Sequence, residues 1–154
     1  MQISETPMLA NRLSSIGLPV LCAILAPHGA QAHGEVRHPA TVGEAVSVIA
    51  NEPIPHVPGK RLVSNIVEYA PGGRSAPHRH ARSAFIYAYV LSGAVRSQVD
   101  SEPARVYRAG EGWFESPGAH HRVSSNASDS VPARLLAVFI VDVGDDPLTV
   151  PDEN

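Results

Sequence analysis

The chain of 154 residues contains one cysteine, Cys22, which lies near the N-terminus. One cysteine can form neither an intramolecular disulfide nor a thiolate cluster, so a metal site would need nitrogen and oxygen ligands. Basic residues are also scarce, since 12 Lys and Arg stand against 15 Asp and Glu, and the formal net charge is −3. No Lys/Arg block is present, and this excludes a surface built to neutralise nucleic-acid phosphates.

The sequence also lacks an apolar run that could cross a bilayer. The apolar stretch from Ile16 to Leu25 is shorter than the roughly 20 residues that a membrane-spanning helix needs. Ala30 and Ala32 follow it, and they place small residues where signal peptidase requires them. Residues 1–32 are therefore predicted to be a signal peptide cleaved after Ala32, which makes the protein periplasmic or secreted. An uncleaved amphipathic helix is the alternative, because Pro19 interrupts the stretch.

After residue 60 no sustained helical periodicity is present. The chain instead contains short β-type runs separated by turn residues, which predict strands at 62–69, 84–91, 94–99, 105–108, 112–115, 120–124 and 133–141. The last run is apolar except for Arg134 and predicts a strand buried on both faces. Seven short strands with frequent turns are typical of an all-β sandwich or barrel.

The remaining segments flank this predicted barrel, which spans residues 60–143. Residues 33–59 are rich in Pro, Gly and His and predict an extended N-terminal arm with one strand near 45–49. Residues 144–154 carry four acidic residues and two prolines, and they predict a loose acidic tail.

Histidines carry the clearest chemical signal in the sequence. His78 and His80 are two residues apart, so on a strand both imidazoles project to the same face. His121 follows the turn at Pro117-Gly118, which redirects the chain into another strand. In a chain with eight histidines such a pair also arises by chance, and its alternative reading is two polar residues on a solvated strand face.

The spacing around these histidines forms two motifs, Gly73-x4-His78-x-His80-x12-Gly93 and Gly110-x5-Ser116-Pro117-Gly118-x2-His121. They resemble the two signature motifs of the cupin superfamily, and the resemblance extends from about residue 62 to residue 141. It implies a small single-domain cupin of the cupin-2 type, with a double-stranded β-helix (jelly-roll) barrel. It also implies one divalent metal ion, Fe, Zn, Mn, Ni or Cu, bound by His78, His80 and His121.

One residue of the family pattern is missing. The first cupin motif normally supplies a glutamate, whose place falls at Ile86 counted back from Gly93, or at residue 84 or 85 counted forward from His80. No carboxylate occurs between His80 and Asp100. This departure predicts a neutral three-nitrogen site with more open coordination positions and weaker metal binding.

Glu115 and Gln98 are the candidates to replace the missing acid. Glu115 lies close in sequence to His121, and Gln98 follows the first motif. Each can equally be an ordinary strand or rim residue. Tyr87 and Tyr89 are candidate catalytic residues that could donate a phenol to a bound substrate, with core packing as the alternative.

Two functions from different classes fit these residues. The first is a mononuclear metal-dependent enzyme, dioxygenase-like, acting on a small organic substrate. The second is a non-catalytic cupin that binds a metal ion or small ligand; a metal-free structural barrel fits less well, because three histidines occupy motif positions. The resemblance further implies a homodimer, with the N-terminal arm as a source of an edge strand.

Overall fold

The structure is a computed structural model that describes residues 41–153. The predicted signal peptide, with Cys22, lies outside this range, as does the start of the predicted arm. The described residues form ten strands and no helix: β1 Val42–Pro53, β2 Lys60–Arg74, β3 His78–His80, β4 Phe85–Ser92, β5 Ala94–Val99, β6 Arg105–Arg108, β7 Gly112–Glu115, β8 His120–Asn126, β9 Ala133–Asp142 and β10 Thr149–Pro151. Within this range no helix is long and apolar enough to cross a membrane.

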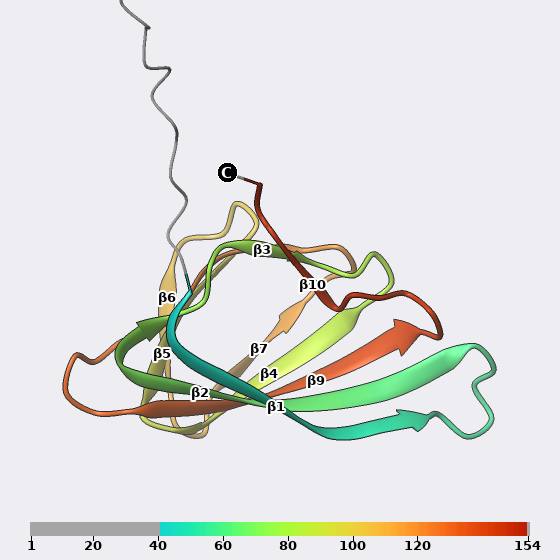
Figure 1. The fold of residues 1–154 in the computed structure, drawn as a ribbon, viewed down its shortest axis with the longest axis horizontal. Coiled ribbons are helices and arrows are strands. Elements are labelled where there is room, and N and C mark those ends of the chain that lie inside the picture. The colour runs from blue at the N-terminus through green and yellow to red at the C-terminus, as the bar shows by residue number, and fades with distance from the viewer. Residues whose placement is uncertain (1–40, 154) are drawn as a thin grey trace, which may run out of the picture. The chain divides into compact units, whose positions relative to one another are not determined.

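The strands pair antiparallel and fold into two layers. The main path runs β10-β3-β8-β2-β9-β4-β7, β1 pairs with β2, and β5 joins β8 to β6. The long strand β2 passes from one layer to the other, since its residues 60–69 pair with β9 and its last residue, Arg74, pairs with Ser125 of β8. Figure 1 shows β1, β2, β9 and β4 below, with β3 and β10 above them. The predicted all-β barrel is confirmed.

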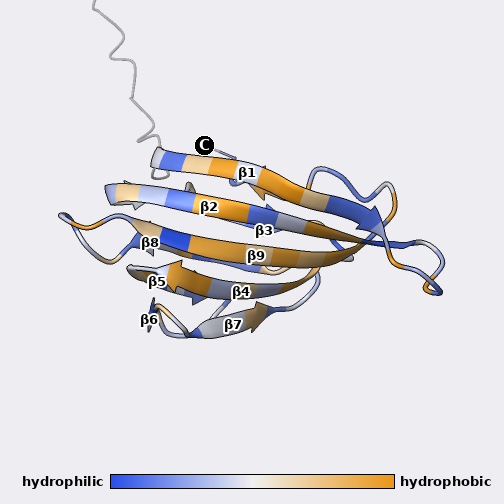
Figure 2. Ribbon diagram, turned by 90° about the horizontal axis from the view of Figure 1, so that it is seen from below, coloured by the Kyte–Doolittle hydropathy of each residue, from blue (hydrophilic) through white to orange (hydrophobic). Residues whose placement is uncertain are grey.

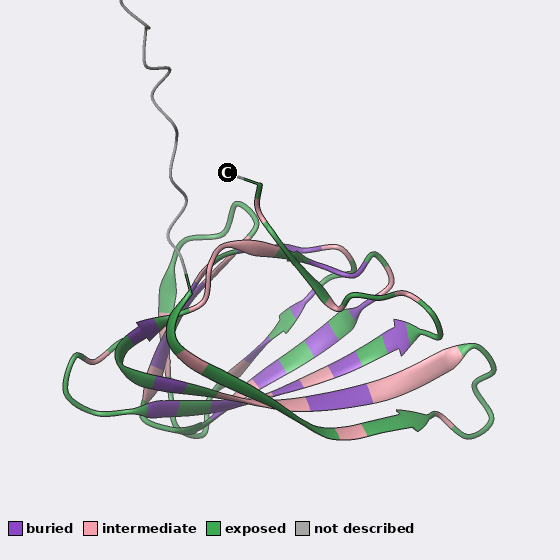
Figure 3. Ribbon diagram, in the orientation of Figure 1, coloured by how far each residue is buried: buried purple, intermediate pink, exposed green. Residues whose placement is uncertain are grey.

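Buried side chains alternate with more exposed ones along the strands, and the buried side chains form the core between the layers. On β9 every second residue from Ala133 to Val141 is buried, and on β4 the buried residues are Ile86, Ala88 and Val90. Figure 3 shows this as stripes along both strands. The prediction that β9 is buried on both faces is wrong, because Arg134, Ile140 and Asp142 on its outer face are exposed. Figure 2 shows that β9 is apolar over most of its length.

Both flanking segments contribute to the barrel. The arm carries the predicted strand, β1, which pairs with β2 in a register that places Val46 opposite Val67. The tail was predicted to be loose, but β10 pairs with β3, with Thr149 opposite His80. Leu148, just before β10, packs against the core, and this apolar contact explains why the tail lies on the barrel.

Candidate metal centre

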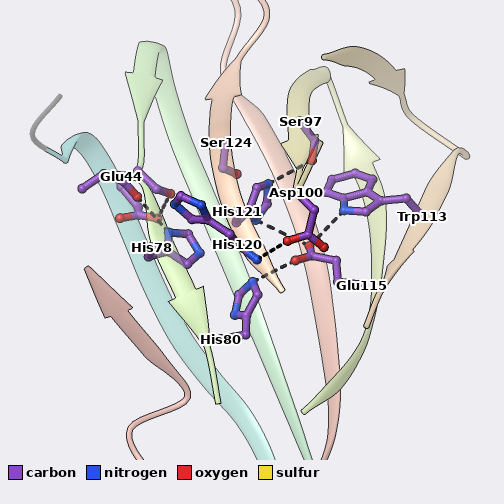
Figure 4. A network of polar contacts seen from close by, with 12 residues as sticks. Glu44, His78, His80, Ser97, Asp100, Trp113, Glu115, His120, His121 and Ser124 are labelled. Carbon is purple, nitrogen blue, oxygen red and sulfur yellow. Dashed lines mark hydrogen bonds and ion pairs between the residues drawn. The ribbon is translucent and has the colours of Figure 1, made fainter. Parts of the chain in front are cut away.

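Strands β3 and β8 bring the three predicted histidines together. His78 and His121 are direct partners in the antiparallel register, and His80 lies two residues further on the same face of β3. The ring centroids are 4.9 Å apart for His78 and His80, 5.2 Å for His78 and His121, and 5.9 Å for His80 and His121. One ligand atom from each ring lies within 4.8 Å of the others, close enough to hold one metal ion. Figure 4 shows the three rings turned toward a common space.

Neighbouring groups fix two of the rings through one nitrogen each. Nδ1 of His78 donates to the carbonyl oxygen of Ala76 at 2.8 Å, and Nε2 of His121 lies 2.9 Å from Oγ of Ser97. Such contacts orient metal-binding imidazoles and leave the second nitrogen free for the ion. His80 differs, because both of its ring nitrogens are buried without a hydrogen-bond partner. A buried polar atom without a hydrogen-bond partner lowers the stability of the fold, and a bound cation would give one of the two His80 nitrogens a partner.

Glu115 also lies in this cluster, as one of the two sequence candidates for an additional ligand. Its side chain on β7 is 3% exposed. Oε2 lies 2.9 Å from Nε2 of His80, and Oε1 lies 3.5 Å from Nδ1 of His121. Trp113 Nε1 donates to Oε1 at 2.9 Å and holds the carboxylate in place. The structure thus brings a carboxylate to the three imidazoles from a different strand.

Burial and charge set these groups in the protonation states that metal ligands require. Burial lowers the pKa of His78, and it lowers the pKa of His121 to about 4. Burial acts to raise the pKa of Glu115, but contact with His80, the charge of His121 and the hydrogen bond from Trp113 lower it to about 2. At neutral pH the centre therefore presents the neutral imidazoles of His78 and His121 beside a charged carboxylate.

A cavity of about 290 Å³ adjoins the histidines. Its walls are mainly apolar, and its apolar lining residues are Val46, Val67, Ala76, Ile86, Ala88, Trp113, Leu135, Ala137, Phe139, Leu148 and Pro151. This size and lining suit a small organic molecule.

A polar chain runs along one wall of the cavity. Oγ of Ser75 donates to the Glu44 carboxylate, and the hydroxyl of Tyr69 lies 2.6 Å from Ser75 Oγ and 2.8 Å from Ser124 Oγ. Burial raises the pKa of Tyr69 to about 12, so its phenol stays protonated. Glu44 was not predicted at this site. In the sequence, only its position two residues before Val46, near the predicted arm strand, places Glu44 on the same strand face as Val46. The register of β1 against β2 shows that this face points into the cavity.

The two catalytic candidates do not lie in this cavity. Tyr87 is 37% exposed and its ring centroid lies 4.8 Å from that of Phe114, while its neighbours Ile86 and Ala88 line the cavity instead. Tyr89 has the same parity as Tyr87 and its ring lies 6.2 Å away. The expectation that one of these tyrosines lines the pocket is corrected, because strand parity turns both to the outer face.

Gln98 and His120 also lie apart from the centre. Nε2 of Gln98 donates to the carbonyl oxygen of Glu102 at 3.1 Å, and its side chain does not line the cavity. The candidate role of Gln98 as a ligand is therefore corrected as well. His120 projects to the opposite face of β8 from His121, and its Nε2 lies 2.8 Å from Oδ2 of Asp152.

The fold and the paired histidine motifs agree with comparison to known proteins. A family model described as the cupin domain, of the cupin-2 type, matches residues 65–139. The chain belongs to the cupin superfamily. No curated protein matches this cupin closely enough to count as a relative.

Several solved cupins and related structures resemble the chain. A recombinant oxalate oxidase in complex with glycolate is 26% identical, with a TM-score of 0.54, and the match covers 71% of this chain and 55% of that one. The cupin thus spans little more than half the length of that oxalate oxidase. A double-stranded β-helix protein from Klebsiella pneumoniae is 17% identical (TM-score 0.56; 75% and 90% covered). A cupin-2 domain from Rhodospirillum rubrum is 14% identical (TM-score 0.55; 75% and 70% covered), and these two show the fold alone.

Proposed function

We propose that this cupin binds one divalent metal ion through His78, His80 and His121 and acts as a metal-dependent enzyme, dioxygenase-like, on a small organic substrate. The observation that carries the proposal is the convergence of three imidazoles beside a small cavity. All three rings are anchored on strands, which hold ligands more rigidly than loops do. Fe, Zn, Mn, Ni and Cu are each compatible with nitrogen and oxygen ligands.

Different residues of the site would have different roles in such an enzyme. A metal ion held there would act as a Lewis acid and provide open positions for substrate, water or dioxygen. The apolar walls would contact the carbon skeleton of a substrate, and Glu44 offers a carboxylate that can accept a proton at the cavity wall. The hydrogen-bond chain from Glu44 to Ser124 holds that carboxylate in place. This proton-accepting group favours the enzyme over the alternative, a non-catalytic metal- or small-ligand-binding cupin.

The oxalate oxidase complex supports a small oxygen-bearing substrate, because glycolate is bound to that protein. The cavity of this cupin is lined by Glu44 and Glu115 and by no Lys or Arg among the described residues. A neutral or singly charged molecule is therefore a better candidate substrate than a dianion, which would face carboxylates with only the metal ion as a counter-charge.

Turnover assays separate the enzyme from the binding protein. The protein is loaded in turn with Fe(II), Mn(II), Ni(II), Cu(II) and Zn(II) and incubated aerobically with a panel of small hydroxy acids, diols and phenols. Product formation or dioxygen uptake that depends on the metal is expected, and Glu44→Gln should slow it while metal content stays unchanged. Metal-loaded protein that turns over no member of the panel would favour the non-catalytic alternative.

We also propose that the protein is exported, on the strength of the predicted signal peptide at residues 1–32. N-terminal sequencing of protein recovered from the periplasm or medium should begin at His33. Intact residues 1–32 on protein recovered from the cytoplasm would contradict export.

A homodimer is proposed through the outer face of the β2-β9-β4-β7 layer. This face carries exposed apolar side chains, namely Phe85 (42% exposed), Tyr87 (37%), Phe114 (65%) and Ile140 (39%). With β1 the layer has five strands, so it is about 20 Å wide and up to about 40 Å long. The resulting area, on the order of 800 Å², matches what each partner contributes to a standard interface. A second copy presents the same apolar face, and two such faces can pack as a sheet on a sheet.

A further inference from the structure

Glu115 lies directly across the ladder from the position where the family's metal-binding glutamate is missing. That position is Ile86 on β4, and the antiparallel register of β4 and β7 pairs Ile86 with Glu115. Side chains of directly opposed residues project to the same face of a sheet with Cβ atoms about 5 Å apart. Glu115 thus presents a carboxylate to the lumen from the strand adjacent to the usual one.

The carboxylate is buried without a cation from the protein. Among the described residues its only ion-pair partners are His80 and His121, and no Lys or Arg lies within ion-pair distance. A buried carboxylate without a compensating charge is strongly disfavoured. A metal ion in the space between the carboxylate and the imidazoles would supply that charge.

The contact with His80 has the distance of a hydrogen bond but not its alignment. Glu115 Oε2 and His80 Nε2 are 2.9 Å apart, yet neither atom has a hydrogen-bond partner. The other carboxylate oxygen is held by Trp113, so Oε2 is the oxygen left free. His80 Nε2 and Glu115 Oε2 thus lie side by side and face the same space (Figure 4). This arrangement is expected of two ligands to one metal ion.

We propose that Glu115 is the fourth protein ligand of the metal centre, so that β7 supplies the carboxylate that β4 lacks. Trp113 is its positioning residue. The proposal rests on the proposed three-histidine site and replaces the neutral three-nitrogen centre expected from the sequence. A divalent ion in this centre carries a net charge of +1, is bound more tightly, and has one fewer open position for substrate.

Metal affinity and spectroscopy of variants test the proposal directly. Glu115→Gln keeps the shape of the side chain and removes its charge, so the affinity for Co(II) or Zn(II), measured by chelator competition, should fall by at least roughly tenfold. The Cu(II)-loaded variant should also show an altered electron paramagnetic resonance spectrum, because one oxygen ligand changes. Glu102→Gln is the matched control, since Glu102 is exposed on a loop, and it should change neither readout.

A rescue variant distinguishes a ligand from a structural residue. Ile86→Glu in the Glu115→Gln background moves the carboxylate across the ladder to the family's usual position, and it should restore metal affinity. Glu115→Gln should reduce the rise in unfolding temperature that bound metal gives, because a ligand stabilises the fold through the ion. A structural ion pair with the histidines instead predicts an unfolding temperature lowered by the same amount with and without metal.

The outcomes separate this proposal from the proposed function. If Glu115→Gln binds metal as tightly as the parent with an unchanged Cu(II) spectrum, Glu115 is not a ligand, although the three-histidine site stands. If the parent binds no metal, the three-histidine site fails and the fourth ligand fails with it.

Discussion

Tyr69 connects the polar wall of the cavity to the core. The side chain is 2% exposed, and its hydroxyl contacts Ser75 and Ser124. Tyr69→Phe leaves both serines without this partner, so the free energy of unfolding should fall by about 1–2 kcal/mol. Chemical denaturation measures the change. Tyr107→Phe is the matched control, because Tyr107 packs its ring on Trp113 and no hydrogen bond to its hydroxyl is found in the described residues. Equal losses for both variants would contradict a role for the Tyr69 hydroxyl.

The centre should make the metal-free protein sensitive to acid. The folded-state pKa of His121 is about 4 against an ordinary 6.5, so the unfolded chain binds a proton first as pH falls below 6.5. Glu115, with a pKa of about 2 against 4.5, acts in the same direction at lower pH. The free energy of unfolding should therefore decrease by a few kcal/mol between about pH 6.5 and 4. Urea titrations at several pH values measure it, and His121→Asn should flatten the dependence. A parent curve that is already flat would contradict the assignment.

The residues of the site were predictable to different degrees. His78, His80 and His121 were found because ligand spacing on a strand is visible in the sequence. Glu115 could be predicted only as a candidate ligand. Its position opposite Ile86 depends on the pairing of β4 with β7, and these two residues are 29 positions apart in the chain. Tyr87 was misplaced because parity tells which residues share a face but not which face is the lumen.

At the scale of elements, the turn between β4 and β5 depends on Gly93. Its φ is +71°, and an added Cβ would lie 2.5 Å from the carbonyl oxygen of Pro132. Gly93→Ala therefore adds a backbone clash to the cost of positive φ, and it should lower the free energy of unfolding by roughly 2 kcal/mol or more. Gly144→Ala is the control, because Gly144 has φ +88° with nothing within 4 Å, and only the conformational cost applies. Thermal or chemical unfolding that ranks the two variants equally would contradict the clash.

The C-terminal strand forms a strap beside the metal centre. β10 pairs with β3, and Oδ2 of Asp152 lies 2.8 Å from Nε2 of His120. The backbone nitrogen of Asp152 also donates to the carbonyl oxygen of Pro77. Asp152→Ala should loosen the strap and release bound metal severalfold faster to a chelator in stopped-flow experiments. Glu153→Ala, at an exposed neighbour, should leave the release rate unchanged. Identical rates for the two variants would rule out the strap as a barrier to release.

Strand positions after residue 60 were largely confirmed, and the misses have physical causes. Periodicity located the runs that became β4 to β9, because alternating burial leaves a direct mark on sequence. β10 was missed since a three-residue strand such as Thr149–Pro151 is stabilised by pairing and packing, not by its own propensity. The burial of β9 was overestimated because the sequence of a strand with an exposed apolar outer face does not differ from that of a strand buried on both faces.

At the scale of the whole molecule, the apolar outer face predicts self-association. Phe114→Glu places a charge at the most exposed of its aromatic side chains and should convert a dimer into a monomer. Light scattering coupled to size-exclusion chromatography measures the mass. Val131→Glu is the control, because Val131 is an apolar residue on the loop before β9 that is 54% exposed, and it should leave the dimer intact. A parent protein that is monomeric at all concentrations would contradict the proposed interface.

The whole account depends on metal bound by the three histidines. Elemental analysis of the protein purified from its native compartment measures this most directly, with His121→Ala and His56→Ala prepared alongside. The prediction is one transition-metal ion per chain in the parent and in His56→Ala, whose histidine lies in an exposed turn, and a loss of bound metal in His121→Ala. A parent without stoichiometric metal, or a His121→Ala variant that keeps its ion, would contradict the account.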